Sequence, residues 1–475
     1  VFIENDLNDA LRQLSRRQSS SSQMLITNRR RSSLAMACDG NPLMGAGMRM
    51  SVVELDDDDL FLNEDLLDNK NHNDAKASSK SNDNMFVQVR KILDPLRIKA
   101  NLSPLNLTIG EPQSPPPAWL NEVLEKESRN WQAYPKAFAN QQFLDDLSIY
   151  FETRFPSVAG KFAFSDHIVP VPGTREPLHF LGYCVKGSKE NSTALVSNPF
   201  YHAWRTGALA SGGEILYMNA TAENHFLAGL DQIDEAVLAR TNIVYLCNPT
   251  NPHGAVASSA YIETAIRLAR RHNFLLVMDE CYIDIWRHNK PLSALEVAAG
   301  MVDEGGSDND IFANLVVLNS LSKRSNAAGL RAGFLCGDRQ FIAAYKQLVA
   351  NGGALVPTPL LHTAGALYRD DAHNQQIRAH YDKSFDLLSQ HLDIQVPDGG
   401  FFLWLGVPDK LHGDDQLMTA ELYQHTGISS VPGSVMATTS QQINPGAGYI
   451  RLAIVHDHET INEAARRLAG FLSSL

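Results

Sequence analysis

Short apolar runs alternate with longer amphipathic stretches from Met85 to the end of the chain. The short runs are rich in β-branched residues and end in Gly, Pro, Asn or Asp, which is typical of buried strands. They cover residues 167–171, 194–196, 242–247, 274–278, 315–318 and 332–336. A longer stretch such as residues 261–272 repeats apolar residues at helical spacing. This alternation predicts an α/β fold with a mostly parallel central sheet.

The last third of the chain, from about Leu361, follows a different order. Helical patterning comes first, then strand-like segments at residues 400–404 and 449–455, and finally an amphipathic helix over residues 459–475. This order predicts a smaller α+β domain. We therefore expect a large domain at residues 131–360 and a small domain that combines residues 86–130 with residues 361–475.

The first 85 residues show weak apolar periodicity. They contain a serine run at residues 19–22, an arginine run at residues 29–31 and an acidic run at residues 56–59. A segment that buries little apolar surface does not offset the entropy of ordering, so we expect a mostly disordered extension over residues 1–85. No acidic residue lies between Asp9 and Asp39, which leaves an organelle transit peptide open beside the cytoplasmic location that we expect.

Composition and charge exclude several classes of protein. The chain has 41 basic and 53 acidic side chains among 475 residues, and the net charge of −12 disfavours nonspecific binding to nucleic acid, which depends on cations. No run of about 18 apolar residues is present, so no membrane span is predicted. The five cysteines lack CxxC spacing, which predicts a reducing compartment, no disulfide framework and no metal site.

Polar residues with distinct chemistry follow four of the predicted strands, where open α/β sheets bind their ligands. Gly173, Thr174 and Arg175 come after the first run and open a helical stretch. Glycine allows close backbone approach, and a threonine hydroxyl at a helix N-terminus can bind phosphate. Taken alone, an ordinary capped turn explains the same residues.

Two further strand ends carry an amide and a carboxylate. Asn248-Pro249 and Asn251-Pro252 follow the run at residues 242–247 and would aim an amide above the sheet, or simply form a turn. Asp279 closes the apolar run at residues 274–278. A carboxylate is costly to bury unless a cation pairs with it, and a protonated heterocycle would be such a cation. A helix cap is the alternative for Asp279.

Lys323 follows the run at residues 315–318, among small hydroxyl residues, and Arg331 follows eight residues later. A lysine with a lowered pKa can form an imine, and Ser320 with Arg331 can hold a phosphate dianion. A lone lysine is ordinarily a solvated charge. Four such strand ends in one chain favour a shared site instead.

Together, these motifs resemble those of the pyridoxal-phosphate-dependent aminotransferases of fold type I, class I/II, over about residues 86–475. The resemblance implies the α/β fold of that family, a large domain that binds pyridoxal 5'-phosphate, amino-acid and keto-acid substrates, and a homodimer with shared active sites. From the charge and the lack of an apolar span described above, we expect no nucleic-acid or membrane partner.

The resemblance also implies roles for individual residues. Lys323 is similar to the lysine that forms an imine with the cofactor, and Asp279 to the acid that keeps the pyridine nitrogen protonated. Asn251 and Tyr282 are similar to the pair that hydrogen-bonds the phenolate oxygen, and Tyr201 to the aromatic residue stacked on the ring. Lys323, Asp279 and Tyr201 are thus the implied catalytic residues.

Phosphate and substrate contacts follow from the same resemblance. The implied phosphate-binding residues are Gly173, Thr174, Arg175, Ser320 and Arg331, with Tyr134 supplied by the neighbouring subunit. Arg451 is similar to the arginine that binds the substrate α-carboxylate, with Gly110 opposite it. Two places depart from the family pattern: His253 replaces the usual threonine, and Ala139, Phe143 and Leu144 replace a glycine and a Leu-Arg pair.

Within the family, residues 173–176, 198–201, 320–326 and 444–451 are most similar to the succinyldiaminopimelate aminotransferases. This implies transamination between glutamate and N-succinyl-2-amino-6-oxopimelate, on the diaminopimelate route to lysine. Another aromatic or dicarboxylic keto acid, or a C–S lyase reaction on the same cofactor, remains open. A cofactor-binding regulator without catalysis is disfavoured because the extension lacks a clear helix-turn-helix, and a nicotinamide enzyme because no G-x-G-x-x-G follows a strand.

Overall fold

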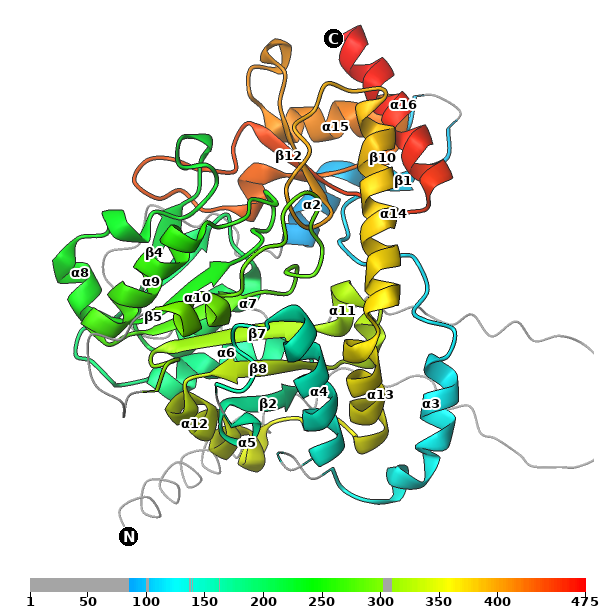
Figure 1. Cartoon of the computed structure of the whole chain (residues 1–475). Coiled ribbons are helices and arrows are strands. Elements are labelled where there is room, and N and C mark those ends of the chain that lie inside the picture. Colours follow the sequence, from blue (N-terminus) through cyan, green and yellow to red (C-terminus); the bar gives the residue numbers. More distant parts are fainter. Residues whose placement is uncertain (1–84, 100–101, 136–137, 139, 162, 302–309) are drawn as a thin grey trace, which may run out of the picture. The chain divides into compact units, whose positions relative to one another are not determined.

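The computed structural model describes residues 85–475, apart from residues 100–101, 136–137, 139, 162 and 302–309 (Figure 1). The predicted extension over residues 1–85 lies outside the described residues, except for its last residue. The predicted boundaries of the two domains stay a prediction.

A seven-stranded sheet, in the order β2-β8-β7-β6-β5-β3-β4, forms the centre of the described chain. Its strands are β2 (Ile168–Val171), β3 (Thr193–Asn198), β4 (Glu214–Asn219), β5 (Thr241–Cys247), β6 (Leu275–Asp279), β7 (Leu315–Ser320) and β8 (Gly333–Gly337). β8 pairs antiparallel with β2 and β7, and the remaining pairs are parallel. The predicted mostly parallel central sheet is confirmed.

Helices pack on both faces of this sheet, since the side chains on both faces of its central strands are buried. In β6, Leu275 and Val277 belong to one apolar cluster, whereas Leu276 and Met278 belong to another, and all four are fully buried. A strand that is covered on both faces reads as an unbroken apolar run, which is why the sequence marked it so clearly. The first cluster packs against α6 (Arg175–Val185), α7 (His202–Ala210) and α12 (Arg339–Gly352). The second packs against α4 (Gln141–Arg154), α9 (Ser259–His272), α10 (Ala294–Gly300) and α13 (Thr358–Arg369).

Four shorter helices complete this part of the described chain: α3 (Leu120–Lys126), α5 (Phe164–His167), α8 (Glu235–Arg240) and α11 (Leu321–Arg324). None of the helices in the described ranges combines the length and the apolar character that a membrane span needs.

The C-terminal part has its own core and recruits the first described residues. A three-stranded antiparallel sheet orders β11 (Val431–Pro432), β12 (Tyr449–Ala453) and β9 (Phe402–Gly406), and β1 (Leu105–Asn106) pairs in parallel with β10 (Ile428–Ser429). The helices here are α2 (Met85–Leu93), α14 (Asp371–Ser389), α15 (Asp415–Thr426) and α16 (His458–Ser474). Leu107 shares one buried cluster with Phe385 and Leu452, so chain segments far apart in sequence form this core. The strands and the final helix predicted for this region are present.

Two details differ from the sequence expectations. The edge strand β4 was not among the predicted strands, although residues 215–218 are a short apolar run; most of its side chains are only half-buried. His167, expected at the start of a strand, instead ends α5, and β2 begins at Ile168.

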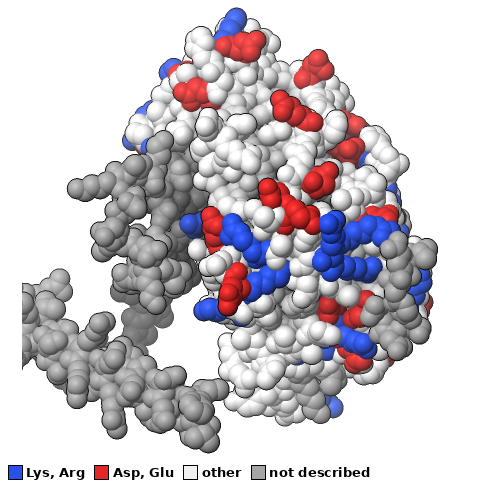
Figure 2. All heavy atoms as spheres, turned by 90° about the vertical axis from the view of Figure 1, so that its left-hand side faces the viewer, with Lys and Arg blue, Asp and Glu red and all other residues white. Residues whose placement is uncertain are grey.

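Basic and acidic side chains lie among one another on the face shown in Figure 2. Arg240 at the end of α8 pairs with Glu214 at 3.0 Å, and Arg271 of α9 pairs with Glu235 at 2.6 Å. Such mixed and paired charges offer no large field of one sign to a polyanion.

Candidate active site

Residues from four strand ends converge at the carboxyl edge of the central sheet. Asp279 is the last residue of β6, and Asn251 follows the neighbouring strand β5. Lys323 lies in α11, directly after β7 on the other side of β6, and Gly173 follows β2. Because parallel strands end at the same edge, residues spread over 150 positions of sequence face one region.

Asp279 is a buried carboxylate, only 4% exposed. Trp204 donates from Nε1 to Oδ2 at 3.0 Å, and the backbone N–H of Cys281 donates to Oδ1 at 3.3 Å. Burial raises the pKa of the Asp279 carboxyl, and these hydrogen bonds oppose the rise. Within the described part of the chain, no cation contributes to this balance. The position therefore suits a ligand that brings a positive charge.

Lys323 is a half-buried amine with a lowered proton affinity. Its Nζ donates to the backbone oxygen of Gly110 at 2.6 Å and lies 5.8 Å from the ring centre of Phe401. Burial lowers the pKa of Lys323 to about 8, and the charges of Arg331 and Arg451 act in the same direction. A larger fraction of this amine is neutral at physiological pH than of an ordinary lysine, so it is the better nucleophile.

Arg331 and Gly173 form a compact cradle for an anion. The Arg331 guanidinium donates to the backbone oxygens of Pro172 at 3.1 Å and Ala328 at 2.8 Å. Gly173 has φ +79°, and a Cβ atom there would clash with Arg331 Nη2. Glycine is thus the residue that lets the guanidinium approach the backbone of this turn.

Hydroxyl groups and the N-terminus of α6 adjoin this cradle. Thr174 Oγ1 lies 3.2 Å from Cys281 Sγ. Arg175, the first residue of α6, donates from Nε to the Tyr201 hydroxyl at 3.3 Å. Ser320 ends β7 and caps α11 with its side chain. These donors and the helix N-terminus together suit a phosphate dianion.

Asn251 and Tyr282 present buried polar groups toward the same region. Asn251 Oδ1 is buried and has no hydrogen-bond partner among the described residues. Tyr282 is 8% exposed and lies edge-on to the rings of Phe401 at 5.4 Å and Phe402 at 5.9 Å. A buried acceptor without a partner calls for a donor from a ligand or a water molecule.

Arg451 is a buried cation on β12, 4% exposed. One guanidinium nitrogen, Nη2, donates to the backbone oxygen of Thr108 at 2.7 Å, and the guanidinium lies 4.3 Å from the ring centre of Phe402. Its Nε is buried without a hydrogen-bond partner in the described ranges. Burial lowers the pKa of Arg451 to about 10, and no described carboxylate offsets this. A carboxylate ligand would fit this unmet charge.

Tyr134 is the predicted site residue that the single chain does not bring to the others. Its side chain is 98% exposed, so it contacts almost nothing in its own chain.

Trp204 is the residue that sequence reasoning missed. It lies three positions after Tyr201 along α7, and this helical spacing is the signal that could have found it.

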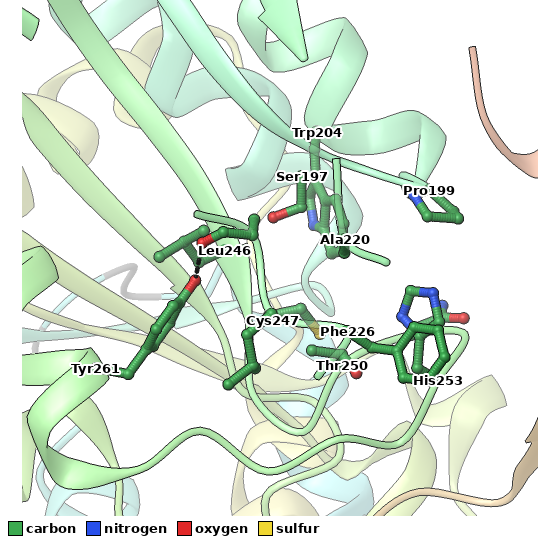
Figure 3. Close-up of a pocket in the computed structure, with 13 residues that line it drawn as sticks. Ser197, Pro199, Trp204, Ala220, Phe226, Leu246, Cys247, Thr250, His253 and Tyr261 are labelled. Atoms are coloured by element: carbon green, nitrogen blue, oxygen red, sulfur yellow. Dashed lines mark hydrogen bonds between the residues drawn. The ribbon is translucent and has the colours of Figure 1, made fainter. Parts of the chain in front are cut away.

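His253, which stands where the family usually has a threonine, lines a narrow cavity together with Asn251 (Figure 3). The cavity has a volume of ≈ 20 Å³, enough for about one water molecule. His253 stacks on Phe226 with ring centres 4.6 Å apart and packs edge-on against Trp404 at 5.2 Å. Burial lowers the pKa of His253 to about 3, so the imidazole is neutral at physiological pH. Histidine here extends an aromatic wall rather than adding a charge.

Comparisons with known proteins agree with this geometry. The family model described as aminotransferase class I and II matches residues 103–468. The LL-diaminopimelate aminotransferase of Nitratidesulfovibrio vulgaris is 27% identical over 379 residues, which cover 77% of this chain and 91% of that protein. The LL-diaminopimelate aminotransferase 2 of Trichormus variabilis is 27% identical over 406 residues, covering 83% and 97%.

Solved structures give the same architecture. An aminotransferase from Neisseria meningitidis superposes with a TM-score of 0.74 at 29% identity, covering 82% of this chain and 97% of that chain. A probable N-succinyldiaminopimelate aminotransferase from Thermus thermophilus has a TM-score of 0.68 at 22% identity, covering 82% and 100%. The second likeness bears on the fold alone.

Proposed function

The chain belongs to the aminotransferase class I and II family, whose members depend on pyridoxal phosphate, and on that premise we propose that it transfers an amino group between glutamate and a keto acid of the diaminopimelate series. The observation that carries the proposal is that an acid and an amine, neither with an ion-pair partner among the described residues, lie at adjacent strand ends. Asp279 is a buried acid without a cation, and Lys323 is an amine whose pKa is lowered to about 8.

The residues present fit pyridoxal phosphate. The Gly173–Arg331 cradle would hold the phosphate, with Thr174, Arg175 and Ser320 as further donors. The unpartnered Asn251 Oδ1 would face a polar ring substituent. When bound, the cofactor supplies an aldehyde for an amine to join and a ring that withdraws electrons from the substrate α-carbon.

The chain's own residues supply binding, orientation and proton transfer. The Asp279 carboxylate is buried from water, so it is the group that stabilises the positive charge of a heterocycle there. Arg451 binds the substrate α-carboxylate and fixes the orientation of the α-carbon. Lys323 carries a proton to and from that carbon, for which a pKa of about 8 is well matched. Phe401 and Phe402 keep water away from this exchange.

The substrate class rests on two kinds of support. Residues 320–326 and 444–451 resemble the succinyldiaminopimelate enzymes, which favours N-succinyl-2-amino-6-oxopimelate as amino acceptor. LL-diaminopimelate is the second candidate, because the curated relatives above carry its name. Both molecules place a second charged group several carbons from the reacting one.

An absorption spectrum tests the reaction. The protein supplied with pyridoxal phosphate should show a visible band that glutamate bleaches and that the correct keto acid restores. Candidates to compare are N-succinyl-2-amino-6-oxopimelate, an aromatic keto acid and oxaloacetate, with LL-diaminopimelate tested as donor in place of glutamate. A band that no amino acid changes would overturn the proposed transamination. Restoration by the aromatic keto acid or oxaloacetate alone would overturn the substrate class. Pyruvate release from cystathionine would point to a lyase.

The exposure of Tyr134 supports a homodimer as the working unit. In this proposal, Tyr134 of one subunit completes the phosphate site of the other. Light scattering should then give twice the chain mass, and Tyr134→Phe should weaken cofactor binding severalfold without changing the dimer. A monomer with full activity would contradict this part of the proposal.

A further inference from the structure

A second cavity, of ≈ 170 Å³, opens between α4, the end of α13 and the start of α14. None of its lining residues is among those proposed to bind cofactor or substrate. Five cations line it, Arg154, Lys290, Arg324, Arg369 and Arg378, against the two carboxylates Asp284 and Asp371. The lining therefore has an excess of positive charge.

Asp284 does not neutralise this excess, because its charge is already shared. Arg154 Nε lies 2.7 Å from Oδ1, and Arg324 Nε lies 2.8 Å from Oδ2. Tyr150 also donates its hydroxyl to Oδ2 at 2.8 Å. Arg369 pairs at 2.9 Å with Asp146, which lies outside the lining.

Two cations of the lining, Lys290 and Arg378, form no ion pair within the described ranges. Lys290 Nζ donates to the backbone oxygen of Arg154 at 2.6 Å. Arg378 Nη1 donates to Asn374 Oδ1 at 2.8 Å, and its guanidinium lies 4.5 Å from the ring centre of Trp286. Burial lowers the pKa of both Lys290 and Arg378, and this effect outweighs the opposing charges of Asp284 and Asp371.

Two residues of this lining also carry buried donors without hydrogen-bond partners in the described part of the chain. Arg154 Nη1 and Trp286 Nε1 are buried and have no hydrogen-bond partner among the described residues. The Glu296 carboxylate lies 3.7 Å from Arg154 Nη1, which is longer than a hydrogen bond. In the described lining, both buried polar side-chain atoms that lack a partner are donors, so the missing partner is an acceptor.

We infer that this cavity is a binding site for a small oxyanion, either a carboxylate or a phosphate, held by Lys290, Arg378 and the free edge of Arg154. The volume is more than eight times that of the cavity beside Asn251, which has room for about one water molecule, so a dicarboxylate or a phosphate ion has room here. Guanidinium groups bind such oxyanions through paired hydrogen bonds, and the Trp286 indole supplies one more donor.

Calorimetric titration of the full chain loaded with pyridoxal phosphate tests the inference, because the cofactor then occupies the other phosphate site. Succinate and inorganic phosphate are titrated separately at constant ionic strength set by sodium chloride. Saturable binding of one or both is expected, and the one that binds identifies the oxyanion. Lys290→Gln and Arg378→Gln should each weaken binding by roughly tenfold, as the loss of one charge-assisted contact does.

Lys161→Gln is the matched control, because Lys161 is also an exposed lysine that donates to a backbone oxygen, that of Ala299, away from the cavity. It should leave binding unchanged. Absence of saturable binding of both anions would overturn the inference. So would binding that persists in the Lys290→Gln, Arg378→Gln double variant and disappears in Arg451→Gln, since that would assign the anion to the substrate site. Lys290 is exposed, so its variant is expected to fold and keeps the test decisive.

Discussion

Two groups of buried charges lie close together in this chain, and they differ in how the charges are balanced. In the arginine cluster (Arg154, Asp284 and Arg324), the carboxylate has a guanidinium on each oxygen. Burial acts to raise the pKa of Asp284, but Arg324 and Arg154 hold it below its ordinary value. In the candidate site, burial raises the pKa of Asp279 and no described cation opposes it.

The comparison separates structural from functional burial of charge. A buried carboxylate with a guanidinium on each oxygen keeps its charge in the folded chain without a ligand, and removal of that carboxylate would leave buried cations uncompensated. Among the described residues of the candidate site, the acid, the amine and the guanidinium each lack a counter-charge, which lowers the stability of the folded chain. A bound ligand with complementary charges would restore that stability. The four substitutions and conditions below test that distinction.

The largest expected effect is that of Lys323→Ala. Without the amine, turnover should fall by at least about 10⁴-fold, because both the covalent attachment and the proton transfer are lost. The visible band of the bound cofactor should disappear as well. Steady-state kinetics and absorbance measure both, with Lys161→Ala as the control that should keep full activity. Retained turnover would remove Lys323 from the reaction.

Asp279→Asn should lower kcat by about 10² to 10³-fold, as the loss of one preorganised charge does. The variant keeps the shape of the side chain, and the cofactor-free protein should be at least as stable as the wild type because an unpaired buried charge is gone. Kinetics and denaturant unfolding of the same preparation measure the two effects. A marked loss of stability without loss of activity would place Asp279 with the structural charges.

The reciprocal substitution, Asp284→Asn, should destabilise the fold by about 3–5 kcal/mol, since it leaves two buried guanidinium groups uncompensated. The free energy of unfolding from urea titration measures this effect. Activity at a temperature where the variant is folded should fall much less than in Asp279→Asn. Equal stability of Asp284→Asn and wild type would contradict the structural role of the arginine cluster.

The smallest expected effect is a dependence of stability on pH in the cofactor-free protein. The folded-state pKa of Lys323, about 8, lies below the ordinary value of 10.5, so the unfolded state binds more protons between these values. Stability should therefore rise as the pH increases from about 8 to about 10. Urea unfolding of the wild type and of Lys323→Met at several pH values measures the effect. The difference between their free energies of unfolding is the contribution of Lys323. A difference that becomes smaller as the pH rises from about 8 to about 10 would contradict the lowered pKa of Lys323.

Much of the candidate site could be predicted because it lies at the ends of strands buried on both faces. Residues 274–278 and 315–318 form unbroken apolar runs, so Asp279 and Lys323 stand out directly after them. Strand β4 was missed although residues 215–218 are apolar, and as an edge strand it leaves most of its side chains only half-buried.

The arginine cluster was out of reach of sequence reasoning for another reason. Arg154 lies 130 positions from Asp284, and Arg324 lies 40 positions from it. No local spacing links them, and each alone is typical of a surface charge. Tyr134 is a different case, because its role follows from the family resemblance and not from the burial pattern, in which its side chain is 98% exposed.

Lys323 and Arg324 are neighbours in the four-residue helix α11, yet they serve the two different charge groups. Successive side chains of a helix point about 100° apart, so one faces the candidate site while the other is fixed by Asp284 and the backbone oxygen of Leu367. It follows that the number of residues between β7 and Lys323 matters more than which residues they are. Adding or deleting one residue before Lys323 would rotate both side chains at once, moving the Lys323 amine out of the candidate site and the Arg324 guanidinium away from Asp284.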